Sequence, residues 1–224
     1  MNQTLEAMAR ALFNHYFPYS PEEDLPEGWD MRSLDEIADY LNGLALQKYP
    51  PEGEDFLPVI KIAQLRTGDT TGADRASTNI PPEYVVQDGD VLFSWSGSLE
   101  VVIWCSGRGA LNQHLFKVTS ECFPKWFYYL WTKHHLSSFQ DIAADKATTM
   151  GHIQRHHLNE AKVLVPPAEL LKAIDGHITP AIDKLVSNRI ESRTLAAIRD
   201  ALLPKLLSGE IRIKDAEKFM EGIV

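Results

Sequence analysis

The chain has 224 residues, of which 44% are hydrophobic, and it carries a formal net charge of −9. A chain of this size can bury one large core, and it contains no apolar run of membrane-spanning length, so we expect no membrane span. The N-terminus lacks the layout of a signal peptide, and Cys105 and Cys122 match no metal or redox spacing. We therefore expect a cytoplasmic protein with free thiols.

The acidity of the chain is confined to one segment. Between Glu22 and Asp55, eleven acids stand against two bases, which accounts for the whole net charge. Because the rest of the chain is balanced, its composition does not exclude contact with phosphate groups.

The N-terminal part predicts two helices. Residues Thr4–Phe17 place their apolar side chains on one stripe, and Pro18 follows directly. After the acidic coil, Ser33-Leu-Asp-Glu36 has the pattern of a capping box and predicts a short helix that buries Leu34, Ile37, Ala38 and Leu41. Asn42-Gly43 favours a left-handed stop to this helix.

The central part predicts several strands separated by short turns. The runs rich in β-branched and aromatic residues are Phe56–Leu65, Val91–Trp95, Val101–Cys105 and Leu111–Val118. A long polar loop, Arg66–Asn79, lacks apolar periodicity, and loops of this length in a compact domain are usually functional. Strands this close together predict an antiparallel sheet or a small barrel.

The C-terminal part is expected to be mostly helical. An aromatic helix, Phe123–His135, is expected to belong to the core, and a second helix covers Ser137–Ala147. Residues Leu158–Val165 predict a strand, after which Pro166-Pro167 precedes a long helix. The predicted fold class is α+β, with a mixed helix-and-strand body, a small antiparallel sheet or barrel, and a long C-terminal helix.

The C-terminal helix is predicted to cover Ala168–Ser208, about 60 Å at the rise of an α-helix. We interpret its apolar stripe as a coiled-coil-like dimerisation surface, made of Leu171, Ile174, Ile178, Ile182, Leu185, Leu195, Ile198 and Leu202. Gly176, Pro180 and Pro204 are expected to interrupt or bend the helix. Two or three shorter helices folded back on the body remain the alternative.

Several enzyme signatures are incomplete in this sequence. Asn79-Ile-Pro-Pro-Glu-Tyr84 lacks the uninterrupted Asn-Pro-Pro-aromatic order of amino-methyltransferases, and Ser94-Trp-Ser-Gly-Ser98 lacks the first glycine of a nucleophile elbow. Glu160-Ala-Lys162 resembles half of a nuclease motif but is expected to be a surface strand pair. His152 and His156 have metal-ligand spacing without a third ligand. We therefore expect no catalytic and no metal-binding residues.

The remaining candidates are polar side chains on the loops, of the types that read base edges or hold phosphates. They are Gln64, Arg66, Thr67, Thr70, Thr71, Arg75, Ser96, Ser98, Arg108, Gln113, His114, Lys146, Thr148, Thr149, His152 and Arg155. Such residues alone are a weak signal, because many surface loops have a similar composition.

Six motifs in this order make the chain resemble the specificity subunit of type I restriction–modification systems. They are Thr4-Leu-Glu-Ala-Met-Ala-Arg-Ala-Leu-Phe13, Leu25-Pro-Glu-Gly-Trp29, Gly89-Asp-Val-Leu92, Ser94-Trp-Ser-Gly-Ser98, Ala110-Leu-Asn-Gln-His-Leu-Phe-Lys117 and Leu202-Leu-Pro-Lys-Leu-Leu-Ser-Gly209. In that family, a target-recognition domain followed by a helical spacer occurs twice in one subunit, and each domain reads half of a split DNA site. This chain has one such unit and looks like the second half of a subunit.

The resemblance implies three regions. Residues 1–20 would form a helix that packs with the spacer, residues 21–167 would form the target-recognition domain, and residues 168–224 would form the spacer and dimerisation helix with its tail. The site residues would lie where the family has no motif, in Arg66–Asn79 and near Arg108 and Thr148–Arg155.

The resemblance also implies the partners. They are double-stranded DNA, a second copy of the chain, a methylation subunit that carries S-adenosylmethionine, and a restriction subunit that uses ATP and Mg. The chain itself would need no cofactor and would catalyse nothing. The alternative function is that of a coiled-coil adaptor without sequence-specific DNA binding.

Overall fold

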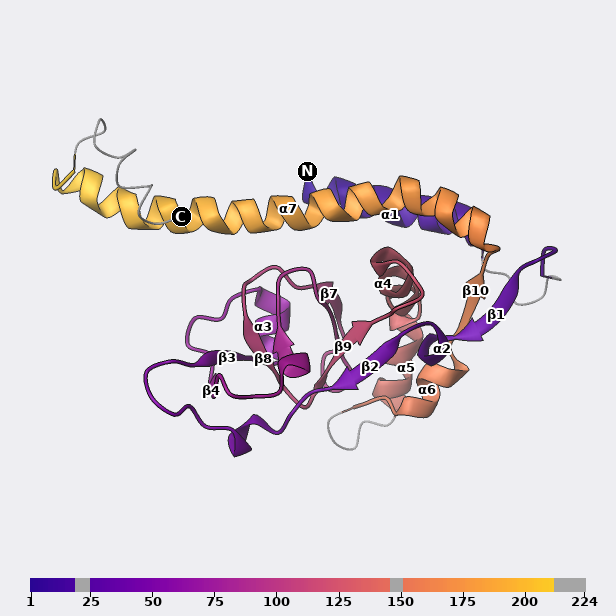
Figure 1. The fold of residues 1–224 in the computed structure, drawn as a ribbon, viewed down its shortest axis with the longest axis horizontal. Coiled ribbons are helices and arrows are strands. Elements are labelled where there is room, and N and C mark those ends of the chain that lie inside the picture. The colour runs from indigo at the N-terminus through magenta and orange to yellow at the C-terminus, as the bar shows by residue number, and fades with distance from the viewer. Residues whose placement is uncertain (19–24, 146–150, 212–224) are drawn as a thin grey trace. The chain divides into compact units, whose positions relative to one another are not determined.

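The computed structural model describes residues 1–18, 25–145 and 151–211 of the chain (Figure 1). The chain divides into two units, Met1–Val186 and Ser187–Val224. The first unit contains every strand of the described residues, and its described helices are α1 (Asn2–Tyr16), α2 (Leu34–Ile37), α3 (Ile62–Thr67), α4 (Lys125–His134), α5 (Leu136–Asp145), α6 (Arg155–Glu160) and the start of α7 (Ala168–Leu207). The 3-10 helices η1 (Leu46–Lys48) and η2 (Pro82–Tyr84) complete the set of described helices.

The main sheet of the first unit is antiparallel and has four strands. Their order is β2 (Asp39–Asn42), β9 (Leu115–Thr119), β6 (Val91–Ser94) and β7 (Val101–Ile103). Helix α4 packs against β7 and β9. Aromatic rings fill the space beside the sheet, with Phe93 stacked on Phe139 of α5 at 5.8 Å between ring centroids. The hydroxyl of buried Tyr40 contacts that of Thr132 at 2.7 Å, which links β2 to α4.

A second sheet has the strand order β4 (Arg75–Ala76), β3 (Leu57–Ile60), β8 (Gly109–Leu111) and β5 (Val85–Val86). The pairing of β3 with β8 is parallel, and the other two pairings are antiparallel. The prediction of small antiparallel sheets is thus confirmed, with one parallel pairing in addition. Among the described strands, neither four-stranded sheet closes into a barrel.

The third sheet pairs β1 (Asp30–Ser33) with β10 (Lys162–Val165), two segments far apart in the sequence. Ser33 ends β1 and caps α2 as predicted, since its backbone N–H donates to Glu36 Oε2 at 2.6 Å. The predicted continuation of this helix to Asn42-Gly43 is wrong, because the backbone becomes extended at Ala38 and the following residues pair with β9 as β2.

Three predicted strands are shorter than expected. The Phe56–Leu65 run ends as β3 at Ile60, and helix α3 buries Leu65 instead. The Leu111–Val118 run is divided between β8 and β9 by a turn in which Leu115 N–H donates to Asn112 O at 2.9 Å. The first half of Leu158–Val165 belongs to α6, because only the later residues pair with β1.

The N-terminal helix is anchored by aromatic side chains. Phe13 of α1 meets Trp131 of α4 edge-on at 5.0 Å, and Phe17 contacts the same ring at 5.6 Å. Glu6 forms an ion pair with Lys133. Trp126 of α4 donates to Asp175 Oδ1 of α7 at 2.8 Å. Helix α4 therefore holds both α1 and the first part of α7.

Helix α7 is one helical span from Ala168 to Leu207, which confirms the predicted long helix, and Gly176, Pro180 and Pro204 do not divide it into the two or three shorter helices of the alternative. Both prolines are exposed, and so are the residues four positions before them. Water can therefore satisfy the carbonyl groups that lose a partner, which lowers the cost of each proline. Among the described residues, no helix is both long and apolar enough to cross a membrane.

Candidate nucleic-acid interface

One group of polar residues, here the Trp95 cluster, lies where β6 ends and β9 begins. It consists of Trp95, Ser96, Gln113, His114 and His152. Ser96 Oγ lies 3.0 Å from His114 Nδ1, and Gln113 Nε2 lies 3.4 Å from the other ring nitrogen of that histidine. The Trp95 ring contacts His114 at 5.7 Å and His152 at 6.4 Å between centroids. The fold thus brings four predicted candidates, Ser96, Gln113, His114 and His152, into one place.

The Trp95 cluster is fixed from two sides. Trp95 Nε1 donates to Asn42 Oδ1 of β2 at 2.9 Å, and an isolated β-bridge joins Ser96 to His152. Ser96 is 3% exposed, so its hydroxyl holds His114 rather than facing solvent. Trp95 and Asn42 were not predicted as site residues, because nothing in their local sequence indicates that β2 and β6 lie on either side of β9, where these two side chains meet.

Arg155, at the start of α6, lies beside this region but is already engaged. Its Nη2 donates to Tyr40 O at 3.1 Å, and its guanidinium lies over the Phe116 ring at 5.8 Å. The side chain is exposed nonetheless. A contact with both the backbone of β2 and a ring of β9 gives this arginine a fixed position at the sheet edge.

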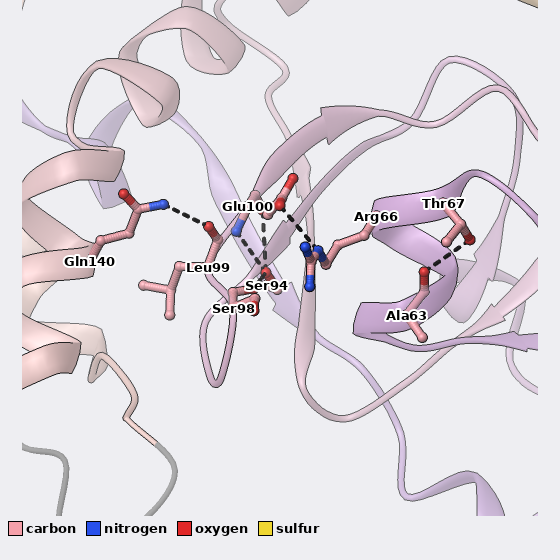
Figure 2. Close-up of polar contacts among 8 residues, drawn as sticks. All are labelled: Ala63, Arg66, Thr67, Ser94, Ser98, Leu99, Glu100 and Gln140. Carbon is pink, nitrogen blue, oxygen red and sulfur yellow. Dashed lines mark hydrogen bonds and ion pairs between the residues drawn. The ribbon is translucent and has the colours of Figure 1, made fainter.

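A second group surrounds an open depression of about 400 Å³, here the Arg66 depression, lined by Arg66, Gly97, Ser98, Glu100, Gln140 and Gly151 among others. Figure 2 shows that Arg66 comes from the end of α3 and reaches toward Glu100. Their Nε and Oε1 atoms are 3.5 Å apart. Predicted residues Arg66 and Ser98 therefore share one site, and Glu100 was not predicted.

The predicted polar loop is more ordered than its composition indicated. Gly68 caps α3 in the left-handed conformation, and Thr67 Oγ1 donates to Ala63 O at 3.0 Å. Asp69 Oδ1 accepts the N–H of Thr71 at 2.8 Å, and hydrogen bonding to Thr71 lowers the pKa of that carboxyl. Thr70 O accepts the N–H of Ala73 at 3.0 Å.

Two predicted residues, Gln64 just before the polar loop and Arg75 within it, contact other residues of the fold. Gln64 Oε1 accepts the N–H of Lys61 at 3.2 Å and so caps α3. The Arg75 guanidinium lies 4.2 Å from the centroid of Phe56, an exposed ring. Arg75 also belongs to β4, so what was expected to be loop is partly an edge strand.

Arg108 is exposed in the turn before β8, and Ser106 in the same segment donates to Gly68 O after α3 at 2.7 Å. This turn is fixed by two bonds, Trp104 Nε1 to Gly107 O at 2.6 Å and Gly107 N–H to Asp88 Oδ1 at 2.7 Å. The predicted residues Lys146, Thr148 and Thr149 lie outside the described residues.

One set of potential metal ligands occurs among the described residues, namely His156, His157 and Glu160, whose ligand atoms lie within 4.8 Å of one another. His157 Nδ1 accepts the N–H of Gln154 at 2.9 Å, so the proton of its neutral ring is on Nε2. Nε2 then carries the proton and the lone pair of Nδ1 is occupied, so His157 could bind a metal only if the hydrogen bond from Gln154 were broken. The remaining pair, His156 and Glu160, is too small a ligand set to assign a metal site.

The predicted dimerisation residues fall into two sets. Ile174, Ile178, Ile182 and Leu185 are buried within the first unit, and Leu171 is half-buried. In the second unit, Leu195 is exposed, Ile198 is half-buried and Leu202 is buried. Of the predicted dimerisation residues, Leu195 is therefore the one that is exposed, and Leu171 and Ile198 present part of their apolar surface.

The sequence profile described as "Type I restriction modification DNA specificity domain" matches residues 26–199, more than half of the chain. The MjaIX type I restriction enzyme specificity subunit of Methanocaldococcus jannaschii is 24% identical in an alignment that is 240 residues long. The alignment covers 96% of this chain and 54% of that protein. The EcoBI specificity subunit of Escherichia coli is 26% identical over 198 residues, which cover 85% and 41%.

Among solved structures, the type I restriction–modification S subunit from M. genitalium aligns with a TM-score of 0.54 and 18% identity. The alignment covers 92% of this chain and 54% of that chain, and this likeness supports the fold. The chain spans about half the length of the relatives that it matches.

Proposed function

We propose that this chain, which belongs to the family of type I restriction modification DNA specificity domains, reads one half of a split DNA sequence. In this proposal it catalyses no reaction. The observation that carries the proposal is the profile match, which includes the body of the first unit and continues into α7. The sequence resemblance implied the same function from six motifs spread over nearly the whole chain.

The arrangement of polar side chains supports this proposal. The Trp95 cluster and the Arg66 depression carry amide, imidazole, hydroxyl and guanidinium groups on segments that hydrogen bonds and an ion pair hold in place. These groups can match the donors and acceptors of base edges, which is how sequence is read directly.

The proposed partners follow from the same family. We expect the chain to recruit methylation subunits, which would supply S-adenosylmethionine and the methyl transfer, and a restriction subunit, which would supply ATP-driven cleavage. In this assignment the chain contributes the choice of sequence, and its variants should change where methylation occurs rather than how it occurs.

We also propose that two copies pair through the part of α7 that follows Val186. The chain spans about half the length of its relatives, and a second copy would supply a second recognition unit. Leu195, Leu203 and Leu207 are exposed, and pairing would remove their apolar surface from water. A two-fold dimer would read a split site with palindromic halves.

The experiment that tests these proposals is coexpression of the chain with its methylation subunit, followed by genome-wide mapping of methylated adenines. We expect a split, palindromic motif, and the purified complex should bind a duplex with that motif less tightly as salt increases. Methylation without sequence preference would instead support a coiled-coil adaptor. A site that is unsplit or asymmetric would refute the homodimer, as would a strict monomer in light scattering.

A further inference from the structure

The Arg66–Glu100 pair joins two elements that are distant in sequence, the end of α3 and the turn between β6 and β7 (Figure 2). The side chains are 58% and 40% exposed, respectively. Exposed ion pairs contribute little to stability, so this pair is not needed to hold the fold together. Its position on the wall of the Arg66 depression indicates a role in binding.

Three hydrogen bonds fix the turn that carries Glu100. Ser94 Oγ donates to Ser98 O at 2.6 Å and accepts the N–H of Glu100 at 2.8 Å. From the other side, Gln140 of α5 donates to Leu99 O at 3.0 Å, as Figure 2 shows. The backbone of Glu100 therefore has a defined position, from which its carboxylate can orient the guanidinium of Arg66.

The charge of the depression argues against a phosphate as its ligand. Of the described residues that line it, only Arg66 and Glu100 are charged, and the two charges cancel. A phosphate here would be attracted by one group and repelled by the other. A base edge carries no net charge and offers separate donors and acceptors, which the arginine, the carboxylate and the nearby Ser98 and Gln140 can match.

We propose that Arg66 and Glu100 together read one G·C base pair in each half-site, an inference that rests on the proposed function. Glu100 holds Arg66 through Nε, which leaves the two terminal nitrogens of the guanidinium as a fork for guanine O6 and N7. The carboxylate is the acceptor type that suits the N4 amino group of the paired cytosine. Glu100 is thus a positioning residue for Arg66 and a second specificity determinant.

Two variants test the proposal in the complex with the methylation subunit. Arg66→Lys keeps the positive charge but removes the planar fork, and Glu100→Gln keeps the shape but removes the negative charge. Each should relax the methylated motif at the same G·C position of the half-site, with discrimination there reduced roughly 5- to 150-fold. The other positions and the spacer should not change.

The matched control is the exposed pair of Arg32 and Asp30 on β1, 2.9 Å apart. Arg32→Lys and Asp30→Asn should leave the motif as it is. A uniform loss of methylation by Arg66→Lys or Glu100→Gln with an unchanged motif would overturn the proposal, and so would tighter binding by Glu100→Gln without a change of motif. If the unsubstituted chain gave no split motif at all, the proposed function itself would have failed.

Discussion

The clearest test of how α7 is used is Ile178→Ala. Ile178 is fully buried in the first unit, although the sequence predicted it as a dimerisation residue. The substitution removes three carbons, and at about 0.8 kcal/mol per buried methylene the transfer loss alone is about 2.4 kcal/mol. The cavity left behind adds to this loss, so a destabilisation of about 2–5 kcal/mol is expected.

Leu195→Ala is the matched control, because Leu195 lies on the same helix but is 58% exposed. In the monomer it should change stability by no more than about 0.5 kcal/mol. Denaturant unfolding of both variants over a range of protein concentrations separates the two roles of the helix. The loss from Ile178→Ala should persist at every concentration, whereas Leu195→Ala should weaken self-association.

Two results would refute this reasoning. If Ile178→Ala and Leu195→Ala lowered stability equally, Ile178 would not be buried within a single chain in the native protein. If the effect of Ile178→Ala disappeared on dilution to monomers, Ile178 would belong to the interface between copies, as the sequence pattern alone had indicated.

Three further predictions concern the spacer, the backbone and the pH dependence of stability. An insertion of about seven residues, roughly two helical turns, between Leu185 and Leu195 should lengthen the spacer of the methylated motif and leave its half-sites unchanged; altered half-sites with the original spacer would contradict this. Gly43→Ala should destabilise the protein in thermal unfolding by about 1–3 kcal/mol, because its Cβ would lie 2.2 Å from Asn112 O. Gly176→Ala, with nothing within 4 Å, should instead stabilise α7 by about 1 kcal/mol. Burial, with the charge of Asp90 as a second cause, raises the pKa of Tyr128 from 10.0 to about 12. As the pH rises, Tyr128 ionises first in the unfolded chain, so the stability that this shift contributes is complete below pH 10 and is lost as the pH rises to about 12. Denaturant titrations of Tyr128→Phe should not show this loss.

The sequence predicted best those features that are determined locally. The capping box at Ser33 involves residues three apart, and the structure contains it as expected. The aromatic helix α4 was predicted from its composition, and its rings fill the core as expected. The strand β1 could not be predicted in this way, because Asp30-Met-Arg-Ser33 has little β-propensity and becomes a strand by pairing with β10.

The candidate site shows the same division between local and distant contacts. The loops that would carry polar candidates were predicted from their composition, and Arg66, Ser96 and Gln113 do lie in the two groups described above. Their partners were missed, because Glu100 and Asn42 reach these groups only through the tertiary fold. A residue that orients another across two elements leaves no periodic pattern in the sequence.

The charge distribution assigns different tasks to this chain and its proposed partners. The net charge of −9 arises from the segment between Glu22 and Asp55, and the charges of the described residues lining the Arg66 depression cancel. Non-specific attraction to DNA depends on cations that neutralise phosphates, which this chain has no excess of. On the proposed function, the methylation subunits must therefore supply most of the affinity, and this chain must supply the discrimination. Arg66→Lys should then change the sequence that is methylated while leaving the salt dependence of DNA binding nearly unaltered.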